Sequence, residues 1–155
     1  MATIWVVDDE ESIRDILDKL LQRLGHKTQL FENAESALKE FKPGSVDAMI
    51  VDIRMPGMDG IAFTKAILEQ EAEASVIMLT GYPSVDIAVE AMQVGAVDFL
   101  SKPCNLGELR VRLNRALEIR EWQLRLKRSK VLTLSLLISL PLWVILGALL
   151  LNMMK

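Results

Sequence analysis

The sequence is short of the residues that most often carry redox and imidazole chemistry. Its 155 residues include one cysteine, Cys104, and one histidine, His26. A single cysteine excludes an intrachain disulfide and fits a reducing compartment. We interpret Cys104 as a small packing residue, because no histidine is available to activate it, and His26 as structural or solvent-facing. The N-terminus lacks a basic leader followed by a long apolar stretch, so no cleaved signal peptide is expected.

An excess of basic residues is also missing from most of the chain. Residues 1–119 carry 12 Lys and Arg against 20 Asp and Glu, net −8, whereas residues 120–155 carry 6 against 1, net +5. Nucleic-acid-binding domains cluster Lys and Arg on their folded part, so this distribution predicts no nucleic-acid partner. The length leaves room for one domain of about 100 to 150 residues and an appendage.

Short apolar runs rich in β-branched residues alternate with segments that have helical periodicity. The runs are 4–7, 28–31, 48–51, 76–79 and 97–100. Apolar residues spaced i, i+3 and i+4 predict an amphipathic helix that stops at Gly25. They are Ile13, Ile16, Leu17, Leu20, Leu21 and Leu24. Further helices are predicted after an N-cap at Asn33, over 61–71, over 85–94, and from 106 to at least 130. Such alternation predicts an α/β fold, a doubly wound five-stranded parallel sheet with helices on both faces.

The end of the chain has no ionisable side chain from residue 131 to 154. As a helix this stretch would be about 36 Å long, against a bilayer hydrocarbon core of about 30 Å. Fourteen of its residues are Leu, Ile or Val, so insertion is favourable by roughly several kcal/mol. Five basic residues precede it within 120–130 and one follows it. We therefore predict a C-terminal transmembrane helix with the body on the cytoplasmic side; the alternative is a core helix of a larger, truncated protein.

Polar residues follow the predicted strands at their carboxyl ends, where α/β sheets bind ligands. Asp8 and Asp9 follow the first strand, Asp52 the third, Thr80 the fourth and Lys102 the fifth. Three carboxylates gathered at one edge would repel one another without a cation. Their oxygen ligands predict Mg²⁺, and the absence of His and Cys from the set argues against Zn²⁺.

A carboxylate beside Mg²⁺ and an ammonium group is equipped to attack a phosphoryl group. Asp52 is the candidate nucleophile and would form an acyl phosphate. Lys102 would neutralise charge on the transferring oxygens, and the Thr80 hydroxyl could hydrogen-bond the product. Phosphorylation would add about −1.5 to −2 charges, which is enough to bias a conformational switch.

Four motifs, in this order and spacing, resemble the receiver domain of bacterial response regulators. They are Val6-Val7-Asp8-Asp9-Glu10, the run 51–60 (VDIRMPGMDG), Leu79-Thr80-Gly81 and the run 98–103 (DFLSKP). The resemblance covers residues 3–121 and is nearest to receivers of the nitrogen-regulation and dicarboxylate-transport class. We divide the chain into a receiver domain (1–121), a basic juxtamembrane extension (122–130) and the predicted span (131–154).

The resemblance implies strand order 2-1-3-4-5 and Mg²⁺ held by Asp9, Asp52 and the backbone carbonyl of Arg54, with Asp8 supporting through water. It implies phosphoryl transfer to Asp52 from a histidine kinase or phosphotransfer protein, followed by self-catalysed hydrolysis and no other enzymatic activity. Thr80 and Phe99 match the family's switch pair. The face formed by the fourth helix, fifth strand and fifth helix would then bind an unknown downstream protein or a second copy. A cis bond before Pro103 is also implied.

Several features leave the downstream function of the predicted receiver domain open. Cys104 stands where the family usually has Phe, and Pro83 stiffens the loop after Thr80. The family's ATPase and DNA-binding domains are not within these 155 residues, so a fragment of a transcriptional regulator is one alternative, and a phosphate sink or shuttle is another. A phosphatase of the haloacid dehalogenase type would need a second Asp two residues after Asp52, where this sequence has Arg54.

Overall fold

The computed structural model describes the backbone of residues 1–153 and the side chains of residues 1–129 and Ser135. Strands and helices alternate along the chain. The elements are β1 (Thr3–Val7), α1 (Glu11–Arg23), β2 (Lys27–Phe31), α2 (Ala34–Glu40), β3 (Ala48–Asp52), α3 (Gly60–Gln70), β4 (Val76–Thr80), α4 (Val85–Val94), β5 (Asp98–Ser101) and α5 (Leu106–Met153).

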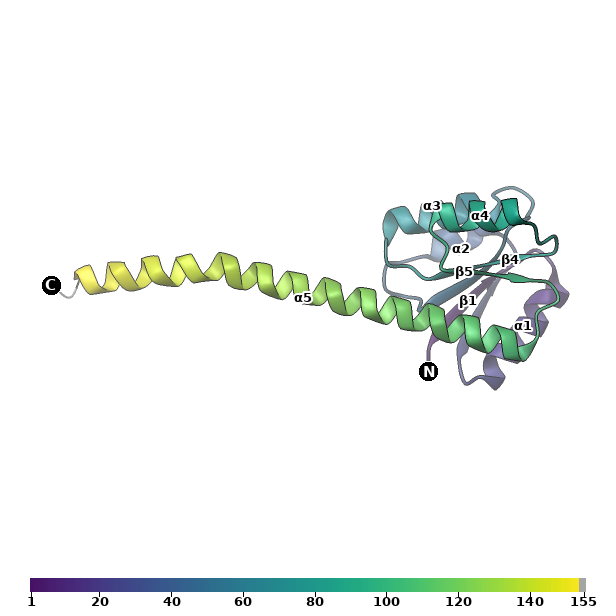
Figure 1. The fold of residues 1–155 in the computed structure, drawn as a ribbon, viewed down its shortest axis with the longest axis horizontal. Coiled ribbons are helices and arrows are strands. Elements are labelled where there is room, and N and C mark those ends of the chain that lie inside the picture. The colour runs from purple at the N-terminus through teal and green to yellow at the C-terminus, as the bar shows by residue number, and fades with distance from the viewer. Residues whose placement is uncertain (154–155) are drawn as a thin grey trace. The chain divides into compact units, whose positions relative to one another are not determined.

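All five strands are parallel and lie in the order β2-β1-β3-β4-β5. The predicted α/β sheet and its strand order are therefore confirmed. The chain divides into two units, 1–120 and 121–155. In the first unit, α2, α3 and α4 cover one face of the sheet, while α1 and the first turns of α5 cover the other (Figure 1).

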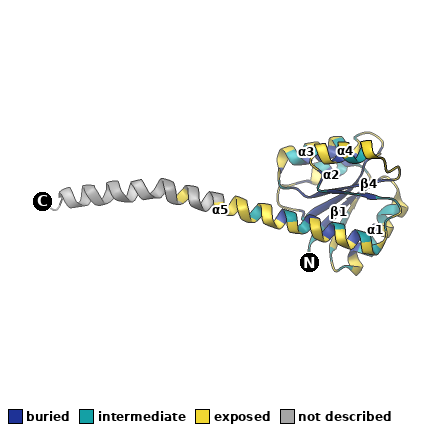
Figure 2. Ribbon diagram, in the orientation of Figure 1, coloured by how far each residue is buried: buried dark blue, intermediate teal, exposed yellow. Residues whose placement is uncertain are grey.

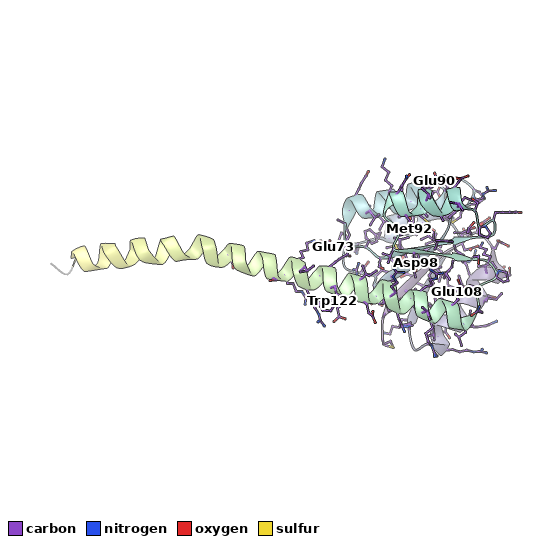
Figure 3. The ribbon with its side chains drawn as sticks, in the orientation of Figure 1. Glu73, Glu90, Met92, Asp98, Glu108 and Trp122 are labelled. Carbon is purple, nitrogen blue, oxygen red and sulfur yellow. The ribbon has the colours of Figure 1, made fainter. Side chains whose placement is uncertain are left out.

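The two faces of the sheet hold separate apolar cores. Residues that alternate along β1 show the division, because Trp5 packs toward α2 and α3 whereas Val6 packs toward α1 and α5. The central strands β3 and β4 are buried at every position (Figure 2), as expected for a parallel sheet that is covered on both faces. Figure 3 shows side chains filling the first unit on both sides of the sheet.

Local signals in the sequence set several helix ends. The Asn33 side chain accepts a hydrogen bond from the amide of Ser36 at 2.8 Å and begins α2, which is the predicted N-cap. Gly95 ends α4 with φ +105°, a left-handed conformation that favours glycine. Among the apolar residues of the first predicted helix, Leu17 and Leu21 are fully buried, whereas the Ile16 side chain is 49% exposed.

The second unit is the continuation of α5 from Glu121 to Met153. Over the residues whose side chains are described, no helix is long and apolar enough to cross a membrane. The predicted span, 131–154, lies outside those residues except for Ser135.

Candidate functional site

The carboxyl ends of β1, β3, β4 and β5 bring the predicted site residues together. Asp8 follows β1, Asp52 and Thr80 are the last residues of β3 and β4, and Lys102 follows β5. Parallel pairing places Asp52 beside Leu79, the residue before Thr80. The sheet register therefore produces the edge that the sequence predicted.

Lys102 is the centre of this arrangement. Its Nζ atom lies 2.8 Å from Asp8 Oδ2, 2.9 Å from Glu10 Oε1 and 3.1 Å from Asp52 Oδ2. The Asp8 side chain is fully buried, the Asp52 side chain is 6% exposed, and that of Lys102 is 11% exposed. One ammonium group thus joins two buried carboxylates and one exposed carboxylate.

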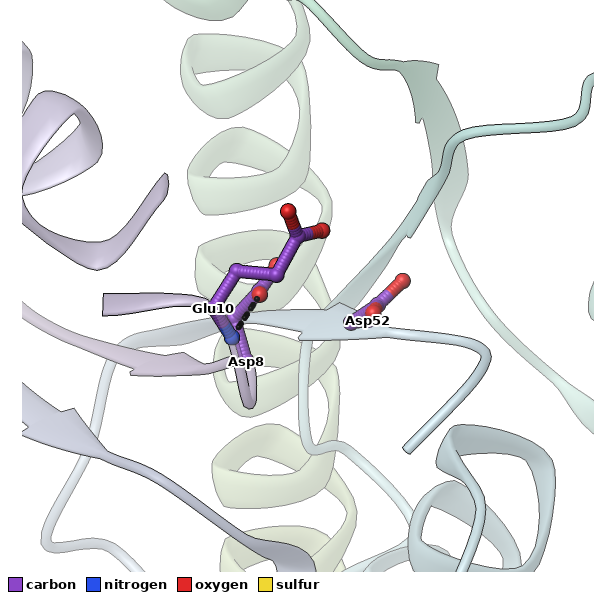
Figure 4. Close-up of side chains that lie close together, drawn as sticks. All are labelled: Asp8, Glu10 and Asp52. Carbon is purple, nitrogen blue, oxygen red and sulfur yellow. Dashed lines mark hydrogen bonds between the residues drawn. The ribbon is translucent and has the colours of Figure 1, made fainter. Parts of the chain in front are cut away.

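Carboxylate oxygens of Asp8, Glu10 and Asp52 lie within 4.8 Å of one another (Figure 4). Burial raises the pKa of Asp8 and of Asp52, against the opposing effect of Lys102. The Lys102 ammonium is itself partly buried, but its contacts with Asp8, Glu10 and Asp52 raise its pKa. Because three carboxylates share one ammonium group, the site has an excess of negative charge that a further cation would balance.

The three oxygen-donor side chains fit a hard divalent ion such as Mg²⁺. The predicted ligand Asp9 is not in this group. Its side chain is exposed and lines a cavity of about 200 Å³ whose other lining residues include Asp52, Arg54 and Lys102. Glu10, which the sequence analysis did not assign to the site, belongs to the group of three carboxylates; its place in the acidic run 8–10 was the available signal.

The backbone around the site is closely packed. The Glu10 amide donates to Asp8 Oδ1 at 2.9 Å, which holds the turn after β1. The Arg54 amide donates to the Asp52 carboxylate. A Cβ atom at Gly60 would lie 2.1 Å from the carbonyl oxygen of Asp52, so only glycine fits where α3 begins beside the candidate nucleophile.

Arg54 and Tyr82 also line the 200 Å³ cavity. The Arg54 guanidinium lies 5.3 Å from the centre of the Tyr82 ring, a cation–π contact. Tyr82 is 70% exposed, and it was not identified from the sequence. The two side chains therefore stand together beside Asp52.

The predicted switch residues lie on β4 and β5. Thr80 is buried, and its Oγ1 accepts a hydrogen bond from the Tyr82 amide at 3.1 Å. Phe99 is partly buried and lines a second cavity, of about 760 Å³, with Val85, Val89 and Met92 of α4. These three α4 side chains are each at least 48% exposed. An apolar surface thus lies next to Phe99.

Three remaining sequence predictions concern the surroundings of the site. The Lys102–Pro103 peptide bond is cis, as the resemblance implied. Cys104 packs at the edge of the core between the sheet and α5, and burial raises the pKa of its thiol. The position of Cys104 in the core and the raised pKa of its thiol agree with a packing role for this residue. His26 lies between α1 and β2, away from the strand ends that carry the site.

Comparison with known proteins places this geometry in a family. Residues 4–114 match the response regulator receiver domain. The chain is 40% identical over 114 residues to the DNA-binding transcriptional regulator NtrC of Escherichia coli strain K12, which covers 74% of this chain and 24% of that protein. It is 41% identical over 100 residues to the transcriptional regulatory protein FixJ of Bradyrhizobium diazoefficiens, covering 64% and 49% of the two chains.

Among solved structures, the receiver domain of NtrX from Brucella abortus superposes with a TM-score of 0.70 at 37% identity, covering 74% of this chain and 98% of that one. The chain spans about a quarter of the length of the NtrC proteins it matches. The matched region contains the complete group of Asp8, Glu10, Asp52 and Lys102. This chain belongs to the response regulator receiver domain family.

Proposed function

We propose that this chain is a phosphorylation-controlled switch that accepts a phosphoryl group on Asp52 from a histidine kinase or phosphotransfer protein. The observation that carries the proposal is the contact of one ammonium group, Lys102, with the buried Asp8 and Asp52. A nucleophilic carboxylate held beside a fixed positive charge is suited to phosphoryl transfer, because the reaction depends on positioning and charge stabilisation.

In the reaction, an Asp52 carboxylate oxygen would form a bond to phosphorus while the bond from phosphorus to the donor imidazole nitrogen breaks. Lys102 would stabilise the phosphoryl oxygens, and the Thr80 hydroxyl would donate a hydrogen bond to one of them, because its bond with the Tyr82 amide uses only the acceptor side of the oxygen. Mg²⁺, held by acidic side chains among Asp8, Asp9, Glu10 and Asp52 with the Arg54 carbonyl, would supply further charge neutralisation. Attack of water on phosphorus would then break the bond to the Asp52 oxygen, releasing inorganic phosphate and regenerating the carboxylate; no other enzymatic turnover is proposed.

The output would be a protein contact on the surface formed by α4, β5 and α5. Phe99 and the exposed apolar residues of α4 line one cavity there, so a change at Thr80 and Phe99 would alter the surface that a downstream protein or a second copy of the chain contacts. A coupling of this kind requires that a packed element of the structure can adopt two alternative arrangements, one in each state of the switch.

Incubation with acetyl phosphate and Mg²⁺ tests the phosphoacceptor. We expect one acid-stable, base-labile phosphoryl group per chain, seen as a mass increase that is lost in Asp52→Ala and on chelation of Mg²⁺. Asp86→Ala, which removes an exposed aspartate of α4, is the control and should retain labelling. Unaltered labelling of Asp52→Ala would falsify the assignment.

We further propose that residues 131–154 tether the receiver domain to the cytoplasmic face of the membrane. The support is the 24-residue stretch without an ionisable side chain and the basic residues before it. Extraction of membranes with alkaline carbonate tests this. The full chain should stay in the membrane pellet, whereas a chain ending at residue 130 should be released; release of both would refute the tether.

The short coverage of NtrC supports a second candidate, in which this receiver is part of a longer transcriptional regulator. Immunoblotting of the native protein separates the candidates by length. A species matching 155 residues favours the tethered receiver. A species about three times longer favours the regulator, because the 114 matched residues are 24% of NtrC.

A further inference from the structure

The first turns of the second unit carry an apolar strip. Trp122 is 64% exposed and Leu126 is 61% exposed. Side chains four residues apart project from the same side of a helix, so the two form one strip. Figure 3 shows the Trp122 side chain standing out from α5. We call residues 121–130 the collar.

The sequence around this strip is rich in basic residues. The collar contains Arg125, Lys127, Arg128 and Lys130 and a single acidic residue, Glu121. Arg125 lies 2.5 Å from Glu121 and 5.5 Å from the centre of the Trp122 ring. The strip is therefore bordered by positive charge, and the guanidinium of Arg125 contacts the tryptophan.

We propose that the collar binds the anionic headgroups of a phospholipid surface. The inference rests on the proposed tether, which would bring the collar to the membrane, and adds the class of lipid that it recognises. Tryptophan is favoured at the boundary between hydrocarbon and headgroups. Arginine and lysine side chains are attracted to the negative surface potential of an anionic leaflet, and their long aliphatic stems can lie along the apolar boundary.

Charge also argues against a second copy of the collar as the occupant. A parallel pair would place the four basic residues of each copy next to those of the other, with one acidic residue per copy to offset them, and like charges at short range are unfavourable. Anionic headgroups complement the same charges. The apolar run from residue 131 begins directly after the collar, which fits a position at the membrane boundary.

The test uses the full chain reconstituted in two kinds of vesicle, phosphatidylcholine alone and an equimolar mixture of phosphatidylcholine and phosphatidylglycerol. Trp143→Phe leaves Trp122 and Trp5 as the fluorophores, and Trp5 is 3% exposed within the core. Brominated lipids quench a tryptophan that contacts them. The double variant Trp143→Phe with Trp122→Phe keeps Trp5 alone and gives the fluorescence to be subtracted. Carbonate extraction measures insertion of the chain separately.

We expect equal insertion in the two vesicles but strong quenching of Trp122 only in the anionic mixture, reduced at high salt. Arg125→Gln with Arg128→Gln should lower the equilibrium constant for binding of the collar to anionic lipid about 30-fold. This factor follows from roughly 1 kcal/mol for each of the two basic residues removed. The matched variant, Lys19→Gln with Arg23→Gln, removes two exposed basic charges from α1 and should change nothing. Arg125→Lys with Arg128→Lys keeps both positive charges and should therefore retain the quenching of Trp122 that the two glutamine substitutions reduce.

Inserted chains with equal Trp122 quenching in both vesicles, insensitive to the charge variants, would overturn the lipid inference and leave the tether standing. Chains that fail to insert but sediment with anionic vesicles in a salt-sensitive way would refute the tether and support the collar. A blue-shifted Trp122 emission without lipid, together with dimeric mass, would show that a second copy covers the strip and would overturn the inference.

Discussion

Arg120 is buried in the first unit and forms an ion pair with Glu71 far away in the sequence. Arg120 Nη2 lies 2.7 Å from Glu71 Oε1, and the two side chains are 6% and 8% exposed. Arg120 Nη1 also donates to the carbonyl oxygen of Glu73 at 3.0 Å, and Glu71 Oε2 accepts from the Gly44 amide at 2.8 Å. This network fixes α5 against the segment between α3 and β4.

We predict that Arg120→Met lowers the free energy of unfolding by about 3–5 kcal/mol, because it leaves a buried carboxylate without its positive partner. The Glu73 carbonyl also loses its donor. Small domains are stable by only about 5–15 kcal/mol, so the loss is a large share of the total and corresponds to a fall in Tm of roughly 10–20 °C.

The chain contains a matched control. Arg125 and Glu121 form a pair with an Nη2–Oε1 distance of 2.5 Å, but both side chains are more than 60% exposed. Arg125→Met should therefore cost only about 0.3–0.5 kcal/mol. Urea unfolding of the full chain in a nonionic detergent, followed by circular dichroism, measures both losses.

A second control separates charge from packing. In Arg120→Met with Glu71→Gln, the buried carboxylate is gone and the Gln oxygen can still accept from the Gly44 amide, so much of the lost stability should return. Equal losses in Arg120→Met and Arg125→Met would refute the reasoning, because burial would then not decide the strength of the pair.

Three further predictions concern single residues. Lys102→Met should reduce labelling by acetyl phosphate about 10²–10³-fold, whereas the exposed Lys65→Met should not; equal labelling would remove Lys102 from the reaction. Because burial raises the pKa of Cys104, iodoacetamide should modify its thiol at neutral pH more slowly in the folded chain than in urea, and equal rates would contradict this. Burial lowers the pKa of His26 from 6.5, so the unfolded chain binds this proton more tightly, and stability is retained above about pH 6.5 and lost as the pH falls below it. His26→Gln should therefore lose less stability than the native chain between about pH 7.5 and pH 5.5 in urea titrations, and an unchanged loss would count against this residue as the source.

The alternation of apolar runs and helical segments was enough to predict the parallel sheet and the edge that carries the site. Parallel strands end at one edge whatever the loops do, so residues directly after or at the end of strands, such as Asp52 and Lys102, meet there. Helix ends such as the Asn33 cap follow from hydrogen bonds made within three residues. The helix caps depend on contacts within a few residues, and the shared edge follows from the regular alternation of strands and helices; both can be read along the chain.

The side-chain contacts within the site and at the base of α5 could be found only from the folded chain. Glu10 reaches Lys102 across 92 residues, and Arg120 reaches Glu71 across 49; neither partner can be found from local spacing. Ile16 fits the helical period but faces solvent, because the rotation of α1 against the sheet, set by Leu17 and Leu21, decides which residues at the margin of the apolar face are covered.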